Sequence, residues 1–222
     1  MSEDPLTTPP TGPPGNSVIA GLSSVEVRWI LPGQLDAAIA GWFRRFPAET
    51  ESREDTYLVD RDLRGLSVKI RAGRALEVKM YHGTVGALEV PGRARGRIQA
   101  WQKWSFPIGP VSQEGDGPPG WTVVRKRRRI SRFRLAGGGI AADVPGWASE
   151  PGCRVELTEV EARDETWWSL GFEAAGPADL VRKALEDTAA LIFARALPGG
   201  AELGLDDCRS YAEWLSYTTS SS

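Results

Sequence analysis

The sequence predicts a domain of the α+β class in which about eight strands form an antiparallel barrel or a large curved sheet, with helices packed outside. Three observations lead to this prediction. Eight segments show the two-residue alternation or the β-branched composition of strands. Only two or three segments show helical periodicity, and turn-forming residues end most of the strand segments. Many strands with few helices in one domain favour a barrel or a curved sheet.

The strand segments are five to fifteen residues long. The first reads SSVEVRWIL and is rich in β-branched residues, which suit a half-buried strand. The expected strands are 23–31, 55–59, 66–71, 75–81, 96–106, 121–135, 153–162 and 166–174. The Gly- and Pro-rich segments 107–120 and 136–152 are expected to be loose connections.

Three segments are expected to be helical. Apolar residues recur at helical spacing within 32–46, directly after the first strand. A second amphipathic helix is expected to have Gly176 as its N-cap and Pro177 as its first residue, and to end at Pro198. A short helix over 206–215 closes the chain.

Composition and the chain ends set the domain organisation. We expect a disordered, Pro-rich leader over 1–16, one domain over 17–217 and a disordered tail over 218–222. The sequence has no secretory signal and no apolar run long enough to span a membrane, which predicts a cytoplasmic protein without a membrane partner. Its two cysteines lack metal-ligand spacing and are expected to be reduced. A single histidine argues against a multi-histidine metal site or a His-dependent triad.

Charge is strongly segregated along the chain. Residues 61–134 hold 17 Lys/Arg against 5 Asp/Glu, whereas the remaining residues hold 10 against 24. Within this basic block, cations occur at every second position of the expected strands, as in Lys69 with Arg71 and Lys126 with Arg128. Alternate residues share one face of a sheet, so several strands would present cations side by side. Neighbouring cations on such a face repel one another unless an anion or facing carboxylates neutralise their charge. The pattern therefore predicts an anion site.

Both signs of charge lie on the faces that the alternation groups together. Those faces hold Ser24, Glu26 and Arg28; Lys69 and Arg71; Glu77 and Lys79; Arg97, Gln99, Trp101 and Lys103; Lys126 and Arg128; Glu156 and Thr158; and Glu173. Phosphoryl chemistry uses this combination, since Lys and Arg bind phosphate oxygens while carboxylates hold a bridging divalent cation.

The strand order and these residues resemble the CYTH, or triphosphate tunnel metalloenzyme, family, over about residues 22–217. The family's Glu-x-Glu-x-Lys, Arg-x-Arg, Thr-x-Lys and Lys-x-Arg motifs are matched by Ser24–Arg28, Lys69–Arg71, Glu77–Lys79 and Lys126–Arg128. Its Arg-x-Glu-x-Glu motif is matched by Arg97–Trp101, its Leu-Asp-x-Val motif by Leu157–Val160, its closing Glu-x-Glu by Glu173 alone, and its Ser-Tyr pair by Ser210-Tyr211. The cations survive, whereas Ser24, Gln99, Trp101 and Thr158 replace acids.

The resemblance implies a closed, eight-stranded tunnel barrel that binds a small-molecule triphosphate or polyphosphate. It implies a phosphate-binding set of Lys69, Arg71, Lys79, Arg97, Lys103, Lys126 and Arg128. It also implies Mg²⁺ or Mn²⁺ on Glu26, Glu156 and Glu173, with Glu26 and Arg28 as the catalytic residues of a triphosphate phosphohydrolase. Arg28 replaces the family lysine and would contact a phosphate oxygen rather than shuttle protons.

Two other interpretations remain open at this point. A site that has lost acidic residues of the family motifs but keeps the basic ones also suits a non-catalytic module that binds polyphosphate, a nucleotide or RNA ends. Alternatively, the basic run 125–134 is a solvated or nucleic-acid-binding patch, which predicts positive charge on the outer surface. The tryptophans at 101, 104, 121, 167 and 168 are expected to pack the core rather than to stack on bases.

Overall fold

A computed structural model describes residues 22–63, 65–110, 119–136, 139–143 and 152–218. Its strands are β1 (Leu22–Pro32), β2 (Glu49–Leu58), β3 (Leu66–Arg71), β4 (Ala75–Val90), β5 (Ala94–Pro107), β6 (Trp121–Ala136), β7 (Gly139–Asp143), β8 (Gly152–Ala162) and β9 (Glu165–Ala175). Its helices are α1 (Ala37–Phe43), α2 (Val181–Phe193) and α3 (Tyr211–Thr218), with a short 3₁₀ turn, η1 (Pro198–Gly200).

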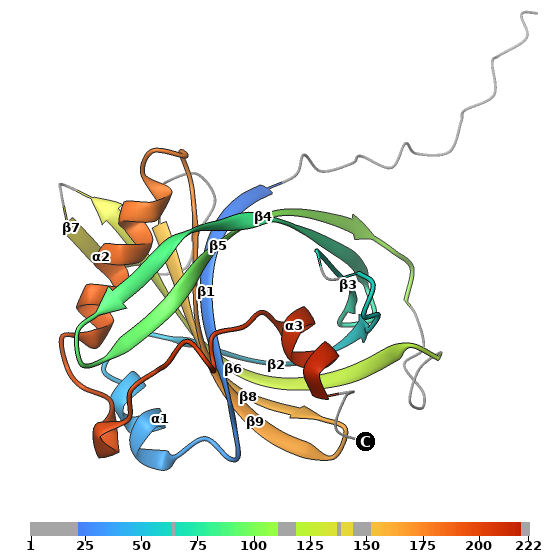
Figure 1. Ribbon diagram of the computed structural model, residues 1–222, viewed down its shortest axis with the longest axis horizontal. Helices are drawn as coiled ribbons and strands as arrows, with labels where there is room; N and C mark the ends of the chain where they lie inside the picture. The colour runs from blue at the N-terminus through green and yellow to red at the C-terminus, as the bar shows by residue number, and fades with distance from the viewer. Residues whose placement is uncertain (1–21, 64, 111–118, 137–138, 144–151, 219–222) are drawn as a thin grey trace, which may run out of the picture.

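Eight of the strands close into an antiparallel barrel (Figure 1). Hydrogen bonding runs in the order β2-β3-β4-β5-β1-β9-β8-β6, and β6 pairs again with β2 over ten residue pairs to complete the ring. The ninth strand, β7, extends the sheet beside β6. The predicted fold class, an eight-stranded antiparallel barrel with helices packed against it, is confirmed.

Several predicted boundaries were wrong. β2 begins at Glu49 rather than residue 55, and β4 continues to Val90 through two register shifts. β7 lies inside the segment 136–152 that was expected to be loose. α2 begins at Val181, because the preceding residues form a separate turn in which Leu180 N–H donates to the Pro177 carbonyl (3.0 Å). α3 covers 211–218 rather than 206–215. The predicted leader, the last residues of the tail and much of both loose segments lie outside the described residues.

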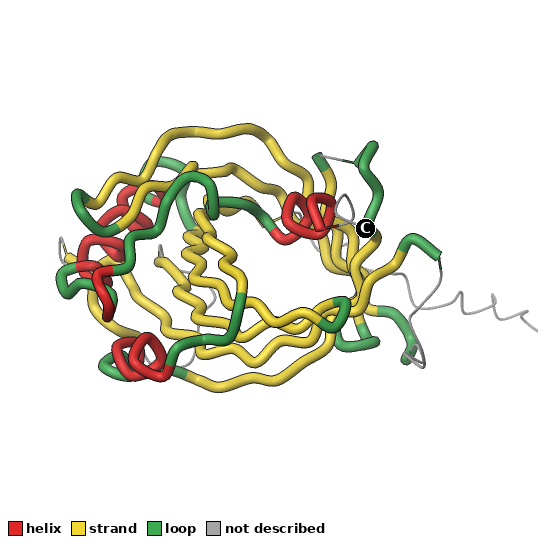
Figure 2. The backbone as a smooth tube through the Cα atoms, turned by 60° about the horizontal axis from the view of Figure 1, so that its bottom comes forward, coloured by secondary structure: helices red, strands yellow, loops and turns green. Residues whose placement is uncertain are grey.

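The main apolar core lies on the outer side of the barrel wall, beneath α1 and α2. Figure 2 draws the helices in red and the strands of the barrel in yellow. On β1, Val27 and Trp29 point outward and are at most 1% exposed. The Trp29 ring meets Phe172 and Phe193 edge to face, at centroid distances of 6.2 and 6.3 Å. Gly96 makes this packing feasible, since a Cβ there would lie 2.5 Å from Val27 and 2.8 Å from Trp29. The outer face of the barrel therefore supplies the core.

A second, smaller apolar cluster closes one end of the barrel. Its wall residues include Ile30, Tyr57 and Val124, which lie two positions along their strands from Arg28, Asp55 and Lys126 and so share the inward face. Trp214 and Leu215 of α3 pack into this cluster and are 1% exposed. The start of α3 is fixed by a reciprocal cap in which the Ser210 and Glu213 side chains accept each other's backbone N–H groups (3.2 and 2.7 Å). α3 thus covers the end of the lumen that the apolar residues line.

Candidate anion site

The barrel encloses a cavity whose wall is dominated by basic side chains. Its charged lining residues are Arg28, Arg53, Lys69, Arg71, Lys79, Lys103, Lys126, Arg128 and Arg154, together with Glu26, Glu77, Glu156 and Glu173. Nine lining cations meet four lining carboxylates, and Asp55 and Glu51 also pair with lining cations without lining the cavity themselves, which leaves an excess of three positive charges. The cavity volume is about 80 Å³, which is smaller than that of a typical small-molecule site, so a ligand has to displace some of the ion pairs between the lining side chains.

One part of the cavity is organised around Glu156. Arg28 NH2 lies 3.3 Å from Glu156 Oε2, whereas Arg128 and Arg154 both contact Oε1. Burial by itself would raise the pKa of Glu156, but Arg128, Arg154 and Arg28 together lower it well below the usual carboxyl range. Glu156 is therefore an ionised carboxylate that holds three guanidinium groups in place.

A glycine creates the space that Arg28 occupies. A Cβ at Gly171 would lie 2.5 to 2.7 Å from three atoms of the Arg28 guanidinium. Gly171 pairs with Arg28 on one side and with Glu156 on the other, so the guanidinium lies across β9 toward the carboxylate. The Tyr211 ring packs 5.0 Å from the same guanidinium.

The opposite wall is organised around Asp55 and Glu77. Lys69 Nζ lies 3.2 Å from Asp55 and 3.1 Å from Glu77, and Arg71 lies 2.9 Å from Glu77. Burial raises the pKa of Glu77, but Lys69, Lys103 and Arg71 outweigh it and lower the value to about 2. Asp55 is fully buried; its pKa is lowered in the same way, since Lys69 and Lys126 outweigh the effect of burial.

Lys126 is the most deeply buried of the cations that line the cavity. Its side chain is 2% exposed and lies 3.1 Å from Asp55 Oδ2. It also donates to the Tyr57 hydroxyl (2.6 Å) and lies over the Tyr211 ring at 3.8 Å. Burial lowers the pKa of Lys126. Tyr211 of α3 therefore connects the helix at the barrel end to the charged cavity.

The cations that line the cavity differ in exposure. Arg71, Arg154, Lys79 and Lys103 have 34%, 28%, 22% and 20% exposed side chains, respectively. Lys126 and Arg128 are only 2% and 4% exposed. A ligand therefore meets the four more exposed cations before the deeply buried pair.

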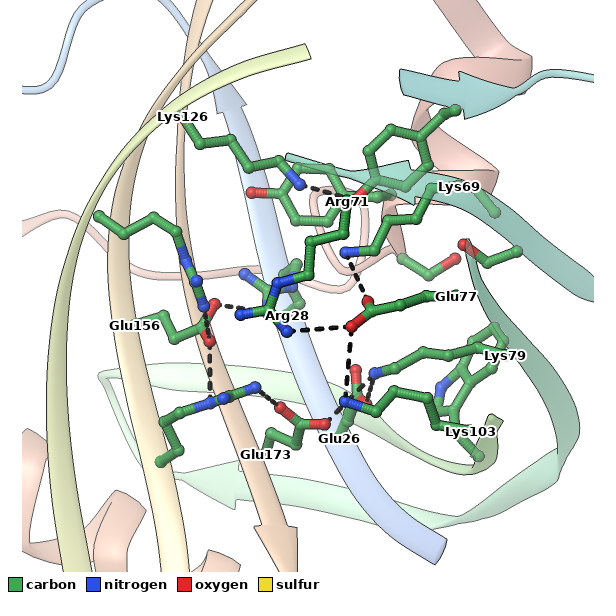
Figure 3. A pocket seen from close by; sticks show the side chains of 18 of the residues that line it. Glu26, Arg28, Lys69, Arg71, Glu77, Lys79, Lys103, Lys126, Glu156 and Glu173 are labelled. Carbon is green, nitrogen blue, oxygen red and sulfur yellow. Dashed lines mark hydrogen bonds and ion pairs between the residues drawn. The ribbon is translucent and has the colours of Figure 1, made fainter. Parts of the chain in front are cut away.

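Ten of the residues predicted from the sequence line this one cavity, and Figure 3 shows most of them pointing toward one another from different strands. They are Glu26, Arg28, Lys69, Arg71, Lys79, Lys103, Lys126, Arg128, Glu156 and Glu173. The roles assigned to them, in catalysis, phosphate binding or metal binding, stay predictions.

Arg97 is the exception in the predicted phosphate-binding set. It is exposed, does not line the cavity, and donates to the Cys208 carbonyl (2.6 Å). The chain before α3 takes the place beside β1 that β5 would otherwise occupy, since Trp29 forms a bridge with Cys208. Arg97 consequently faces this segment rather than the cavity.

The three carboxylates predicted to bind a metal ion are already held by basic side chains. Both oxygens of Glu156 contact guanidinium groups; Glu173 contacts Lys79 and Arg154, and Glu26 contacts Lys79. Within the part of the chain that the structure describes, no group of three or more His, Cys, Asp or Glu side chains is arranged to hold a metal ion. Mg²⁺ prefers several oxygen ligands around one open position, so this donor set does not fit it.

Sequence reasoning missed five residues of the site. They are Arg53, Asp55, Tyr57, Arg154 and Tyr211, of which Asp55 is the buried partner of several lining cations. Arg154 shares the face of Glu156 by simple alternation, and this signal was present in the sequence. Arg53, Asp55 and Tyr57 also alternate, but β2 was predicted to begin too late to reveal the set.

Among the described residues, two uncharged side chains of the barrel wall have a buried polar group without a hydrogen-bond partner. The Trp101 side chain lines the cavity and is 4% exposed, and its indole N–H is unpaired. The Thr158 hydroxyl on β8 is unpaired as well and is fully buried. The indole N–H is thus a neutral donor in the wall of a cationic cavity.

The basic run of β6 is divided between the two faces of the barrel. Lys126 and Arg128 point inward, whereas Arg125 and Arg127 are exposed. Outside the barrel, Arg125 pairs with Glu54 at 3.1 Å, and Arg129 pairs with Glu159 at 3.3 Å. The outer surface of β6 is therefore a mixture of charges rather than a continuous basic patch.

No family model matches the chain, and no curated protein matches it. Among solved structures, a conserved hypothetical protein from Pyrococcus furiosus is 16% identical, with a TM-score of 0.45 over 85% of this chain and 98% of that one. A protein from Pyrococcus horikoshii is also 16% identical, with a TM-score of 0.43 over 88% and 99%. The Pct1 RNA triphosphatase of S. pombe, solved with the Spt5 CTD, is 10% identical, with a TM-score of 0.39 over 79% of each chain. At these scores the matches carry no argument about function.

A search of the described residues finds no helix with the length and apolar character needed to cross a membrane.

Proposed function

We propose that this chain binds a polyphosphate anion, either tripolyphosphate or the triphosphate group of a nucleotide, inside its barrel. The observation that carries the proposal is the excess of cations over carboxylates on the lining of one cavity. Buried charge of one sign is costly without a counter-ion, and a linear polyphosphate supplies oxygens along its whole length.

The geometry of the cations supports a chain-like ligand. Lys103 and Arg71 lie at the more exposed part of the cavity, and Lys126 and Arg128 lie deep inside it. Arginine and lysine bind phosphate oxygens through strong, charge-assisted hydrogen bonds. The Trp101 indole N–H adds a neutral donor to the same wall. A ligand with several phosphates in a row suits this distribution better than a single phosphate does.

Hydrolysis of a terminal phosphoanhydride would be a further step, and it stays a prediction. The mechanism that the resemblance implies needs Mg²⁺ or Mn²⁺ on Glu26, Glu156 and Glu173, whose oxygens contact basic side chains instead. Binding is therefore the function that the geometry supports best. Membership of the CYTH family, as a divergent relative, and a cytoplasmic location are part of the proposal.

The test is isothermal titration calorimetry with tripolyphosphate and ATP, on the natural sequence and on two double variants. Lys69→Ala with Arg71→Ala removes two inward-facing cations, and we expect tripolyphosphate affinity to fall about 100-fold, since hydrogen bonds to charged groups contribute about 1.5 kcal/mol or more each. Arg125→Ala with Arg127→Ala removes the same charge from the exposed face of β6 and should change affinity less than about threefold.

Three outcomes would contradict the proposal. Equal losses in both double variants would mean that net charge, rather than the cavity, attracts the anion. Absence of tripolyphosphate and ATP binding by the natural sequence would remove the function altogether. Tight binding of a labelled single-stranded oligonucleotide that only the Arg125/Arg127 variant loses would favour the nucleic-acid interpretation. Phosphate release in the presence of Mg²⁺ or Mn²⁺, measured in parallel, decides whether hydrolysis accompanies binding.

A further inference from the structure

A metal ion that bridges a protein and a polyphosphate needs carboxylate oxygens that face a shared open position. Glu173 and Glu156 lie on neighbouring strands of the cavity wall and are the natural pair for such a site. A metal ion bound by both carboxylates would occupy the space between them.

Arg154 fills that space. Its Nε lies 2.9 Å from Glu156 Oε1, and its NH2 donates to Glu173 Oε2. The position follows from the sheet itself, because Arg154 pairs directly with Glu173 across β8 and β9 and lies two residues before Glu156 on the same face. The guanidinium therefore lies beside Glu173 because of the register between β8 and β9, and beside Glu156 because alternate residues of β8 share a face.

A third carboxylate, Glu26, is likewise bound by a basic side chain. Glu26 lies directly opposite Glu173 on the other side of β9, and Lys79 contacts both of them. The carboxylates Glu26, Glu173 and Glu156 therefore alternate with the cations Lys79 and Arg154 across the wall. A divalent ion would have to displace a bound cation to reach two carboxylates at once.

We infer that the cavity binds its polyphosphate without a divalent metal ion, with the Arg154 guanidinium in the position that a bridging metal would occupy. This inference rests on the proposed function and deepens it. Arginine keeps its charge at every physiological pH and has five donor N–H groups, so the donors not used by the two carboxylates are available for phosphate oxygens. Arg154 is 28% exposed and lines the cavity, so a ligand can reach it.

The first experiment measures tripolyphosphate binding by calorimetry in buffer freed of metal on a chelating resin, and again with excess MgCl₂ at matched ionic strength. We expect binding in the metal-free buffer and equal or weaker binding with Mg²⁺, because Mg²⁺ neutralises part of the charge on free tripolyphosphate. Binding that requires Mg²⁺, or that strengthens tenfold with it, would overturn the inference and leave the proposed function intact. Absence of binding in both buffers would overturn both.

The second experiment measures Mn²⁺ binding to the protein alone by electron paramagnetic resonance. The natural sequence should bind no stoichiometric Mn²⁺, whereas Arg154→Ala opens the space between Glu156 and Glu173 and should gain a Mn²⁺ site there, although Arg28 and Arg128 still contact Glu156 and Lys79 still contacts Glu173. The same variant should lose about 10- to 100-fold in metal-free tripolyphosphate affinity. Arg127→Ala, which removes one exposed cation from the outer side of β6, is the matched control and should change neither readout.

Stoichiometric Mn²⁺ binding by the natural sequence that Glu173→Gln abolishes would overturn the inference. So would a folded Arg154→Ala protein that binds no Mn²⁺ and keeps the original tripolyphosphate affinity. If circular dichroism shows that Arg154→Ala does not fold, Arg154→Met keeps the aliphatic stem and replaces it in both measurements.

Discussion

The two faces of the barrel wall differ in chemistry, although the same strands supply both. On β1, Val27 and Trp29 point outward into the apolar core beneath the helices, whereas Glu26 and Arg28 point into the cavity. Small barrels commonly fill their interior with side chains that pack as a core. Here the larger apolar core lies outside the barrel, and the middle of the lumen is charged.

This difference separates the residues that stabilise the fold from those that are available to a ligand. Burying apolar surface is favourable in proportion to its area. Buried ion pairs are weak evidence for stability, because the desolvation of two charges offsets most of their attraction. The charged lumen is therefore better explained by what it can bind than by what it adds to folding. Four predictions test this contrast, beginning with the largest expected effect.

The largest effect is expected at acidic pH and originates on the inner face. The pKa of Glu77 is lowered to about 2 from a usual value of 4.5, since Lys69, Lys103 and Arg71 outweigh the opposing effect of burial. The folded state then binds fewer protons than the unfolded chain. Stability from this carboxylate is complete above about pH 4.5 and is lost as pH falls through about 2.

Asp55, Glu156 and Glu173 also have lowered pKa values, because neighbouring cations outweigh burial, so their losses add to that of Glu77. Urea unfolding followed by circular dichroism between neutral pH and about pH 2 measures the total. A denaturation midpoint that does not change over this window would contradict the prediction.

Trp29→Ala tests the outer face. The side chain is fully buried among Phe172 and Phe193, so its removal leaves a large cavity and should lower the free energy of unfolding by about 3–5 kcal/mol. Leu191→Ala on α2 is the control, because Leu191 is 39% exposed and should cost less than about 1 kcal/mol. Similar losses for both variants would mean that the outer core is not the main source of stability.

Asp55→Asn compares the two faces at neighbouring positions of β2. Asp55 is fully buried and contacts Lys69 and Lys126, so its neutral replacement leaves the buried Lys126 without a carboxylate partner and should cost about 3 kcal/mol. Glu54→Gln removes the same charge on the other face, where Glu54 pairs with the largely exposed Arg125, and should cost about 0–1 kcal/mol. Equal costs in denaturant unfolding would contradict the contrast.

Gly171→Ala should have the smallest effect on folding. A methyl group there would lie within 2.7 Å of the Arg28 guanidinium, which must move away from Glu156 at a cost of about 1–3 kcal/mol. Gly139→Ala in β7 is the matched control, because a Cβ at that position meets nothing within 4 Å. Tripolyphosphate titration of both variants shows whether the displaced Arg28 also matters for binding. An unchanged free energy of unfolding for Gly171→Ala would mean that Gly171 is not needed to make space for Arg28.

The residues that share one face of a strand could be predicted from the sequence, because the alternation of faces along a strand is a local property. In β1, apolar and charged residues alternate from Val25 to Trp29, whereas residues 125–129 of β6 are all basic. The shared face of Lys126 and Arg128 was therefore identified from the two-residue period of a strand and not from an apolar–polar pattern. The beginning of β2 carries no such signal: its sequence ETESRED is polar at every position, because one face meets the charged lumen and the other meets solvent. The prediction therefore began the strand late and missed Arg53.

Contacts between distant segments could not be predicted in the same way. Arg97 has the alternation of a lumen residue, but the chain around Cys208 lies against β1 at that level and takes Arg97 as a partner. Alternation could have placed Arg154 on the face of Glu156, but only the register between β8 and β9 places it against Glu173. Neither contact is visible in the composition or period of a single strand.

The amino-acid order by itself determined which side chains share a face of each strand, since a two-residue period needs no tertiary information. Only the closed barrel decided that the charged faces point inward, which carboxylate each cation meets, and that α3 covers one end. Those outcomes depend on hydrogen-bond register and ring closure, which join residues far apart in the chain and are set by the packing of the whole molecule.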